Sequence, residues 1–396
     1  MSEWKECKLG ELIDLFSGGT PSKENHSYWE GNIPWISAKT MTWHKVSTSD
    51  LNISEEGLRN GTRLANVNDI LLLVRGSGLF NDIPICIVEK PVTFNQDIKA
   101  IRAKNPEHQE FLYYWLHSNK KGLYEILEET GIGAGKFDTE LLKDLDISMP
   151  IIDSEREKIV AIAKSIFDKI DLLHRQNATL EAMAETLFRQ WFVEEAKEDW
   201  ETKQLKEVTD IGIGRTPPRK ESQWFSIDQN DVKWISIKDM GSDGVFISKT
   251  SEYLTRHAIQ RFNIPVISRH TVVLSFKMTV GRVAITSVEM LSNEAIAHFK
   301  FKTITPFTKE YLYLFLKTYK YDLLGSTSSI VTSINSAMIK EMEILIPDNQ
   351  TMNEFKEITE PVFFKINHNQ IQIRTLTTLR DTLLPKLMSG EVRVEG

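Results

Sequence analysis

Cysteine is scarce in this sequence, and long apolar runs are missing. The 396 residues include two cysteines, Cys7 and Cys86, which are too few for a disulfide framework or for a zinc site of their own. No stretch of 18 apolar residues occurs, which excludes a membrane-spanning helix. The charged N-terminus lacks the apolar core of a signal peptide. With 41% hydrophobic and 26% charged residues, the composition predicts a cytoplasmic protein of roughly two to four domains.

Catalytic signatures are absent as well. Pro-Pro occurs once, at Pro217 and Pro218, without the flanking residues of an adenine-methyltransferase site. The glycine-rich run at 131–137 departs from the phosphate-loop pattern, because Phe137 offers no hydroxyl group to a magnesium ion, and we interpret it as a glycine turn. The nine histidines lack metal-ligand spacing. We therefore predict no catalytic residues, no metal site and no cofactor in this chain.

The formal net charge of −7 hides a difference between the two halves of the chain. Residues 1–150 contain 16 basic and 22 acidic residues, whereas residues 200–347 contain 19 basic and 15 acidic residues. Net charge bears on partners and solubility rather than on fold. The second segment favours a polyanionic partner. The first does so only if its basic residues gather on one face.

The sequence contains one long internal repeat with a period near 196 residues. The matches keep their order over nearly the whole chain, while small insertions move the offset between 196 and 200. The matched pairs include Trp4 with Trp200, Thr20 with Thr216, Trp35 with Trp234, Asn95 with Asn293, Tyr113 with Tyr313, Pro150 with Pro347 and Leu187 with Leu383. A period this long indicates two duplicated modules rather than a solenoid.

Each module begins with a segment of mixed secondary structure. Short β-rich runs bounded by turn residues predict strands at 69–74, 83–88 and 99–102, and again at 271–276, 282–288 and 297–301. Runs rich in tyrosine and leucine predict short helices at 110–117 and 310–317. The fold class is therefore predicted to be α+β, with two duplicated mixed domains.

Each mixed domain is followed by a long helix. Apolar positions between 159 and 191 alternate four and three residues apart, the heptad spacing typical of a supercoiled helix pair. We predict that the two helices of the chain pair with each other; the alternative is that each helix packs on its own globular domain. Pro361 is predicted to lie in a first helical turn, and Pro385 to kink or end its helix. The predicted pairing residues are Ile166, Ile170, Leu173, Asn177, Leu180 and Leu187 with Ile366, Asn369, Ile373, Leu376 and Leu383.

The pattern divides the chain into four parts. Residues 1–150 and 200–347 form the two mixed domains, and residues 151–199 and 348–396 form the two helices. A seam of this length makes a rod of roughly 50 Å at about 1.5 Å per residue. One turn of B-DNA is about 34–36 Å. Such a rod could hold two modules over sites about one turn apart.

With the repeat and both helices in place, the sequence resembles the specificity subunits of type I restriction–modification systems. The resemblance covers essentially the whole chain. It rests on the duplicated order of five segments, at 18–23, 33–37, 95–99, 186–192 and 384–392. The last two are the most specific. The two halves differ in places, because Gly18-Gly19 becomes Gly214-Arg215 and Asn95-Gln96-Asp97 becomes Asn293-Glu294-Ala295.

The resemblance implies a non-catalytic DNA-binding subunit. Each mixed domain would be a target-recognition domain that reads one half of a split, asymmetric sequence in double-stranded DNA. The paired helices would set the gap between the halves. They would also dock adenine-methyltransferase subunits, two of them in our expectation, and motor-nuclease subunits would join the complex. S-adenosylmethionine, ATP and magnesium are expected on those partners and not on this chain.

Residues that could contact DNA lie in the repeated segments. Hydroxyls, backbone N–H groups and cations bind phosphates, and lysine and arginine also bind guanine edges. Trp35, Ile36, Trp234 and Ile235 are predicted to be core instead, and Asn95 and Asn293 could equally be turn formers. For each residue alone, a plain surface role fits as well. The predicted contacts are Thr20, Ser22, Lys23, Ser37, Lys39, Arg75 and Ser77 in the first domain, and Arg215, Thr216, Arg219, Lys220, Ser236, Lys238, Lys277 and Arg282 in the second.

Two other hypotheses remain open from the sequence. The first is a helical scaffold whose globular domains bind protein, which the acidic first domain favours. The second is an accessory part of a DNA-cleaving enzyme with an unrecognised active site. Metal-dependent cleavage by the isolated chain would identify the latter.

Overall fold

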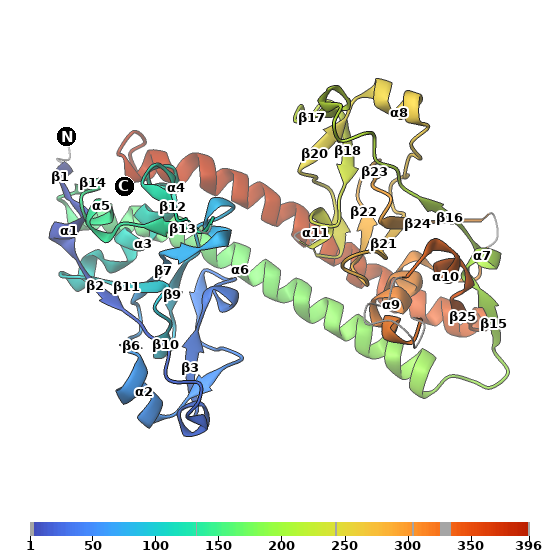
Figure 1. The fold of residues 1–396 in the computed structure, drawn as a ribbon, viewed down its shortest axis with the longest axis horizontal. Coiled ribbons are helices and arrows are strands. Elements are labelled where there is room, and N and C mark those ends of the chain that lie inside the picture. Colours follow the sequence, from blue (N-terminus) through green and yellow to red (C-terminus); the bar gives the residue numbers. More distant parts are fainter. Residues whose placement is uncertain (1–3, 132, 242–243, 303–304, 325–333, 395–396) are drawn as a thin grey trace. The chain divides into compact units, whose positions relative to one another are not determined.

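The computed structural model describes residues 4–131, 133–241, 244–302, 305–324 and 334–394 (Figure 1). The chain forms two compact units. Unit 1 comprises Met1–Leu172 with Arg374–Gly396, and unit 2 comprises Leu173–Ile373. Each unit therefore contains one mixed domain and a part of both long helices, rather than one domain with its own helix.

The domain of unit 1 is built on a five-stranded sheet. Its strands lie in the order β2 (Ile13–Ser17), β11 (Ile98–Ala103), β7 (Ile70–Leu73), β9 (Ile85–Val88) and β4 (Lys45–Val46). Strand β7 is buried along its whole length, as its uninterrupted apolar sequence requires. Helix α3 (Gln109–Ser118) packs on β9 and β11. The strands and the helix predicted at 69–118 are confirmed, with boundaries shifted by one or two residues.

Smaller sheets and short helices complete unit 1. A four-stranded sheet has the order β5 (Asn52–Ile53), β3 (Ile33–Ile36), β10 (Val92–Phe94) and β6 (Leu64–Ala65). Another contains β12 (Leu127–Glu129), β13 (Gly135–Phe137) and β8 (Arg75–Gly76), and β1 (Trp4–Lys8) pairs with β14 (Asp146–Pro150). The short helices are α1 (Leu9–Leu12), α2 (Glu55–Gly61), α4 (Lys120–Glu125) and α5 (Thr139–Lys143).

Unit 2 repeats this plan. Its five-stranded sheet has the order β16 (Thr209–Ile213), β24 (Ile296–Phe301), β21 (Val272–Ser275), β22 (Val283–Thr286) and β19 (Phe246–Ile247), strand for strand the order of unit 1. A second sheet contains β17 (Phe225–Ser226), β20 (Glu252–Leu254), β18 (Val232–Ile235) and β23 (Leu291–Ser292), and β15 (Glu201–Gln204) pairs with β25 (Glu343–Ile346). Its helices are α7 (Leu205–Val208), α8 (Arg256–Phe262), α9 (Lys309–Thr318) and α10 (Ser336–Glu341). The predicted α+β duplication is confirmed.

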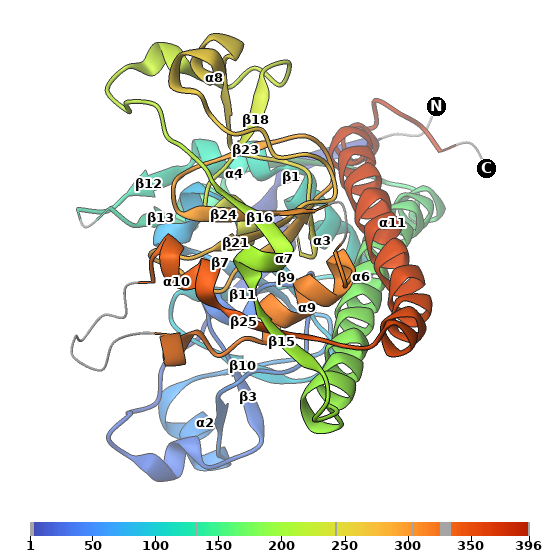
Figure 2. The ribbon, with the colours of Figure 1, turned by 90° about the vertical axis from the view of Figure 1, so that its right-hand side faces the viewer.

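Two long helices, α6 (Asp153–Arg189) and α11 (Asn349–Met388), pass through both units (Figure 2). In unit 1, Ile159 and Ala163 near the start of α6 share a core with Leu384 and Leu387 near the end of α11. In unit 2, the end of α6 packs with the start of α11. The helices are therefore paired and antiparallel. The apolar seams predicted that the helices pair, but they did not predict the antiparallel direction.

Helix α6 also packs on a globular domain in each unit, so the alternative interpretation, in which each helix packs on its own domain, holds only in part. Phe167 on α6 is buried beside Tyr114 of unit 1, with ring centroids 5.1 Å apart. Phe188, further along α6, is buried beside Tyr311 of unit 2, at 5.3 Å. Both aromatic side chains lie outside the predicted seam. A heptad pattern describes only the face toward the other helix, which is why the second buried face was missed.

The prediction for Pro361 needs correction, and so does one of the two roles predicted for Pro385. The helix begins at Asn349, where the Asp348 carboxylate accepts a hydrogen bond of 2.9 Å from the Thr351 N–H. Pro361 therefore lies inside the helix, not in its first turn, and the packing of the helix outweighs the missing backbone hydrogen bond. Pro385 does not end the helix either. The helix continues to Met388 and stops before Gly390, which has a left-handed φ of +73°.

Asn177 and Asn369 meet across the helix pair within unit 2. The Asn369 Nδ2 donates to Asn177 Oδ1 at 2.9 Å, and Asn369 is fully buried. An amide pair of which Asn369 is buried and Asn177 half-buried favours one register of the helices.

Replacing Asn369 alone with leucine should therefore lower the thermal stability more than replacing both asparagines. The single change removes the donor to Asn177 Oδ1, at a cost toward the lower end of about 1–3 kcal/mol because Asn177 is half-buried, whereas an apolar pair of similar shape is nearly neutral. Unfolding midpoints of the two single variants and the double variant test this. Simple additivity of the two single effects would show that the amides do not act as a pair.

Candidate nucleic-acid interface

The loop that follows β2 in unit 1, residues 18–23, is held down at several points. We call it the first loop. Its Gly19 N–H donates to the Phe94 carbonyl at 2.9 Å, and the Trp35 indole donates to the Gly19 carbonyl at 3.0 Å. The Thr20 hydroxyl donates to Gln96 Oε1 at 2.6 Å. These hydrogen bonds fix the conformation of the first loop, which is therefore not a loose surface turn.

The loop that follows β16 in unit 2, residues 214–220, is held in the same way, and we call it the second loop. The Arg215 N–H donates to the Ser292 carbonyl at 2.8 Å, and the Trp234 indole donates to the Arg215 carbonyl at 3.1 Å. The Thr216 hydroxyl donates to the Glu294 carboxylate. Both tryptophans are buried, as predicted, and their indole N–H groups explain why tryptophan stands there.

Glycine is needed at the start of both loops. A side chain on Gly18 would run into the Phe94 carbonyl oxygen, and one on Gly214 would run into the Ser292 carbonyl oxygen. These are the equivalent backbone atoms of the two units. The glycine is thus shared because the loop crosses directly over the end of a strand. The next position differs between the units: a side chain on Gly19 would meet the Gly61 carbonyl oxygen, whereas Arg215 stands there in unit 2.

Most cations predicted to contact DNA in unit 1 lie at its surface. Lys23, Lys39 and Arg75 are exposed, and no ion pair or hydrogen bond of their side chains is found among the described residues. Ser22 and Ser77 are exposed beside them. Ser37 lies in a tight turn, where its N–H donates to the Thr40 hydroxyl at 2.9 Å. Thr20 is half-buried and donates to Gln96, as described above.

The predicted contacts of unit 2 fall into two groups. Lys220, Lys238 and Lys277 are exposed, with no ion pair among the residues that the structure describes. The others serve the fold: the Arg215 guanidinium donates to the carbonyls of Phe262 and Asn263, that of Arg282 donates to the Ile237 carbonyl at 2.7 Å, and the Ser236 hydroxyl donates to Asp239 at 2.6 Å.

Arg219 is the most constrained of these side chains. It makes two hydrogen bonds to the Glu252 carboxylate, at 2.6 and 3.0 Å. Its guanidinium also lies over the rings of Phe225, at 4.4 Å, and Trp234, at 4.7 Å. An arginine held on both sides in this way stabilises the second loop.

The structure also brings together residues that the sequence did not single out. Gln96 lines a hollow of about 430 Å³ in unit 1. Three cations line the same hollow: Arg75 on β8, Lys99 on β11 and Lys136 on β13. Lys136 and Arg75 are paired residues of adjacent strands, and β13, which ends the glycine-rich run, also pairs with β12. The glycine turn predicted at 131–137 includes residue 132, which lies outside the described residues. The sequence pointed to this place through Arg75, a predicted DNA contact, and through the segment 95–99, but Gln96, Lys99 and Lys136 were not predicted as DNA contacts.

Asn95 and Asn293 are turn formers, one of the two roles expected for them. The Asn95 Oδ1 accepts from the Asp97 N–H at 3.1 Å, and the Asn293 Oδ1 accepts from the Ala295 N–H at 3.1 Å. These turns place the intervening residues, Gln96 and Glu294, at the start of β11 and β24.

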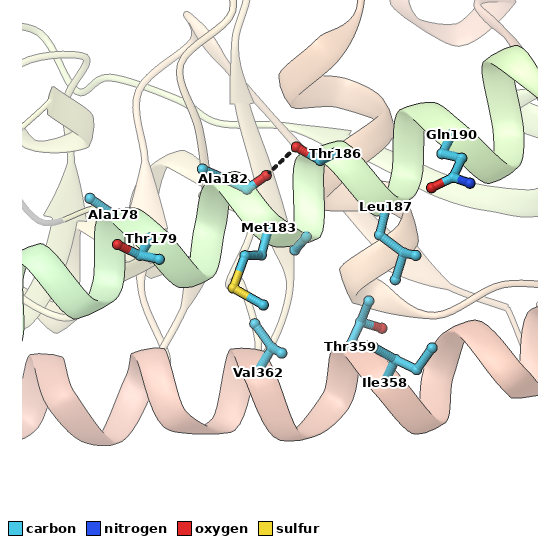
Figure 3. A pocket seen from close by; sticks show the side chains of 11 residues that line it. Ala178, Thr179, Ala182, Met183, Thr186, Leu187, Gln190, Ile358, Thr359 and Val362 are labelled. Carbon is cyan, nitrogen blue, oxygen red and sulfur yellow. Dashed lines mark hydrogen bonds between the residues drawn. The ribbon is translucent and has the colours of Figure 1, made fainter.

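A groove lies between the two long helices in unit 2 (Figure 3). Its volume is about 740 Å³, and its lining is mostly apolar. Ala178, Ala182 and Met183 come from α6, and Ile358 and Val362 come from α11. Met183 is 58% exposed, which is unusual for a large apolar side chain on a paired helix.

The described residues contain neither a membrane-spanning helix nor a cluster of metal ligands. No described helix is long and apolar enough to cross a membrane. In the same part of the chain, no three histidine, cysteine, aspartate or glutamate side chains cluster as metal ligands would.

Comparison with known proteins identifies the family. The family model described as the type I restriction modification DNA specificity domain matches residues 1–182 and 197–374. The MjaIX specificity subunit of Methanocaldococcus jannaschii is 25% identical over 99% of this chain and 94% of its own length. The EcoR124I/EcoR124II specificity subunit of Escherichia coli is 35% identical over 43% of this chain and 41% of its own.

A solved structure agrees in fold. The S subunit of a type I restriction–modification system from M. genitalium has a TM-score of 0.58 and 15% identity, covering 98% of this chain and 96% of the other. Two domain matches that together span most of the sequence establish the relationship. The chain belongs to the family of type I restriction–modification DNA specificity proteins.

Proposed function

We propose that each duplicated domain reads one half of a split, asymmetric sequence in double-stranded DNA. One observation carries this proposal: the first and second loops are fixed by the same contacts, while the side chains they present differ. Two domains that read different half-sites need loops held in the same backbone arrangement but carrying different side chains. Since family members are the specificity components of type I complexes, the chain recognises DNA and is not an enzyme by itself.

The exposed polar groups of the two domains supply the proposed contacts. Lys23, Lys39, Lys220 and Lys238 would bind phosphates, and Arg75 and Lys277 would reach the DNA from equivalent strand ends. Ser22 and Ser77 would add exposed hydroxyls. Thr20, Ser37, Thr216 and Ser236 are half-buried, and the hydroxyls of Thr20, Thr216 and Ser236 already donate within the protein, so these four would contact DNA only as acceptors or through neighbouring groups. We assign Arg215, Arg219 and Arg282 mainly to holding the loops, because their guanidinium groups already have protein partners.

The paired helices are proposed to set the gap between the half-sites and to dock the partner subunits. The partners of such a subunit are DNA, methyltransferase subunits and restriction subunits. In finer detail, we propose two adenine-methyltransferase subunits, with S-adenosylmethionine, ATP and magnesium bound by the partners, and a cytoplasmic location. The apolar groove around Met183 supports a docking role for the helices. The scaffold hypothesis is not favoured, because the family match covers both domains.

Selection from a random duplex library tests the proposal. The chain is assembled with its methyltransferase partner, and bound duplexes are sequenced. Two short conserved blocks at a fixed separation are expected. Enrichment of a single continuous block, or of no block, would contradict a two-domain reader.

Replacing Lys220 with alanine should weaken binding to all duplexes alike. Loss of one phosphate contact lowers the slope of log K against log salt by about one, without changing the selected sequence. Lys206, which lies on the short helix α7, offers a charge-matched control in the same unit. An unchanged slope for Lys220→Ala would remove this residue from the interface.

Arg219→Ala should behave differently from Lys220→Ala. It removes the bonds to Glu252 and the ring contacts. Because this ion pair is about half exposed, the thermal unfolding midpoint should fall only slightly, together with the affinity. An unchanged midpoint with a reduced salt slope would instead make Arg219 a phosphate ligand.

A further inference from the structure

The same hydrogen bond occurs at the same place in both units, with one chemical change. In unit 1 a threonine hydroxyl, that of Thr20, donates to the amide oxygen of Gln96. In unit 2 the equivalent hydroxyl, that of Thr216, donates to the carboxylate of Glu294. Both acceptors follow an asparagine turn and precede the equivalent strands β11 and β24. We call these the threonine–acceptor pairs.

The shared part of each pair is one oxygen that accepts from threonine. Holding the loop needs no more than that oxygen, which glutamine and glutamate both provide. The remaining atoms of the two terminal groups, an amide in Gln96 and a carboxylate in Glu294, differ. The Gln96 amide keeps an NH₂ donor and a second lone pair on its oxygen, whereas the Glu294 carboxylate has acceptors only. The change therefore alters what the position offers to a ligand, and leaves its structural bond intact.

The surroundings of both side chains suit a nucleic acid. Gln96 is exposed and lines the hollow that also contains Arg75, Lys99 and Lys136, and Lys99 Nζ is held by Ser17 Oγ at 2.5 Å. Asp97 and Asp138 line this hollow too, so its formal charge is only slightly positive. A base edge with a neighbouring phosphate fits such a mixture of donors and acceptors better than a free anion does.

Glu294 is also exposed, and it remains ionised. Burial alone would raise its pKa, but the hydrogen bond from Thr216 and the charges of Lys277 and Arg219 outweigh burial and lower the pKa below its ordinary value. The group is therefore an obligate acceptor at neutral pH.

We infer that Gln96 and Glu294 are equivalent base-reading positions, Gln96 selecting adenine in one half-site and Glu294 selecting cytosine in the other. Glutamine can bind adenine through N6 and N7 together, and glutamate accepts from the N4 amino group of cytosine. The threonine of each pair fixes the orientation of the reading group in advance. This inference rests on the proposed function, because it assigns residues within the DNA interface proposed above.

Exchanging the two groups tests the inference. The Gln96→Glu and Glu294→Gln variants are each assembled with the methyltransferase partner, and the methylated sequences are mapped on genomic DNA. Gln96→Glu should convert one A·T pair of one half-site to a G·C pair, leaving the other half-site and the gap unchanged. Glu294→Gln should make the reverse change in the other half-site. Preference for the original base should fall about 5- to 150-fold.

Asn81→Asp is the matched control for added negative charge. Asn81 is exposed in unit 1 and does not line the hollow. The Asn81→Asp variant should lower the extent of methylation without changing which DNA sequence is methylated. If Gln96→Glu and Glu294→Gln also leave the methylated DNA sequence unchanged, the inference is overturned. The threonine–acceptor pairs would then only hold the loops in place. If the wild-type complex itself yields no split sequence, the proposed function fails instead.

Discussion

Insertion of one heptad into each long helix should lengthen the gap between the two half-sites by about three base pairs. Seven residues add about 10 Å of helix, and base pairs are about 3.4 Å apart. The insertions belong between Leu173 and Leu180 in α6 and between Ile366 and Ile373 in α11. These two segments contain Asn177 and Asn369, which are hydrogen-bonded to each other in unit 2. A heptad keeps the apolar seam in phase. Duplex selection with this variant should recover both original half-sites.

The control for this experiment is the insertion into α6 alone. It shifts one seam against the other and separates Asn177 from Asn369, so stability and binding should both fall. An unchanged gap with the double insertion would refute a role of the helices in measuring distance. A changed half-site sequence would show that the helices also shape the recognition domains.

The Gly214→Ala variant should lose recognition of the half-site read by unit 2, while the other half-site stays defined. The new methyl group would lie against the carbonyl oxygens of Ser292 and Asn293, which are backbone atoms and cannot move cheaply. The second loop must then lift from the strand, breaking the hydrogen bonds of Arg215 and Thr216. Overpacking of this kind costs about 1–3 kcal/mol, or about 5- to 150-fold in affinity.

Two further variants make this prediction specific. Gly18→Ala would cause the same steric clash in unit 1, against Phe94. It should therefore weaken the sequence preference in the other half-site instead. Gly131→Ala is the control, because nothing lies within 4 Å of the added carbon there. Equal effects of all three variants, or loss of both half-sites with Gly214→Ala alone, would contradict independent reading by two domains.

Much of the fold could be predicted from the sequence because its signals are local and occur twice. The buried strand at Ile70–Leu73 is an uninterrupted apolar run, and its repeat at Val272–Ser275 supports the same prediction. The helix seams likewise predicted the pairing. Antiparallel packing could not be predicted, because an apolar seam has no direction. Phe167 and Phe188 were missed for a related reason, since their partners come from distant strands and helices.

The candidate interface was harder to predict than the fold. The sequence predicts the two loops as places of DNA contact, but it could not show that Arg219 is hydrogen-bonded to Glu252 or Arg282 to the Ile237 carbonyl. Those contacts join residues that are tens of positions apart. Gln96 stands out in the sequence only as part of the segment 95–99, because its bond to Thr20 spans 76 residues. Residue type predicted which side chains could contact DNA, and tertiary contacts decide which are free to do so.

A single-base map of adenine methylation, with and without this gene, tests the central claim most directly. The account predicts that deletion removes one split, asymmetric sequence with a fixed gap, and that restoring the gene restores it. The Gly214→Ala gene should restore a sequence that is degenerate in one half only. A map that does not change on deletion, in cells where the methyltransferase partner is active, would contradict the account.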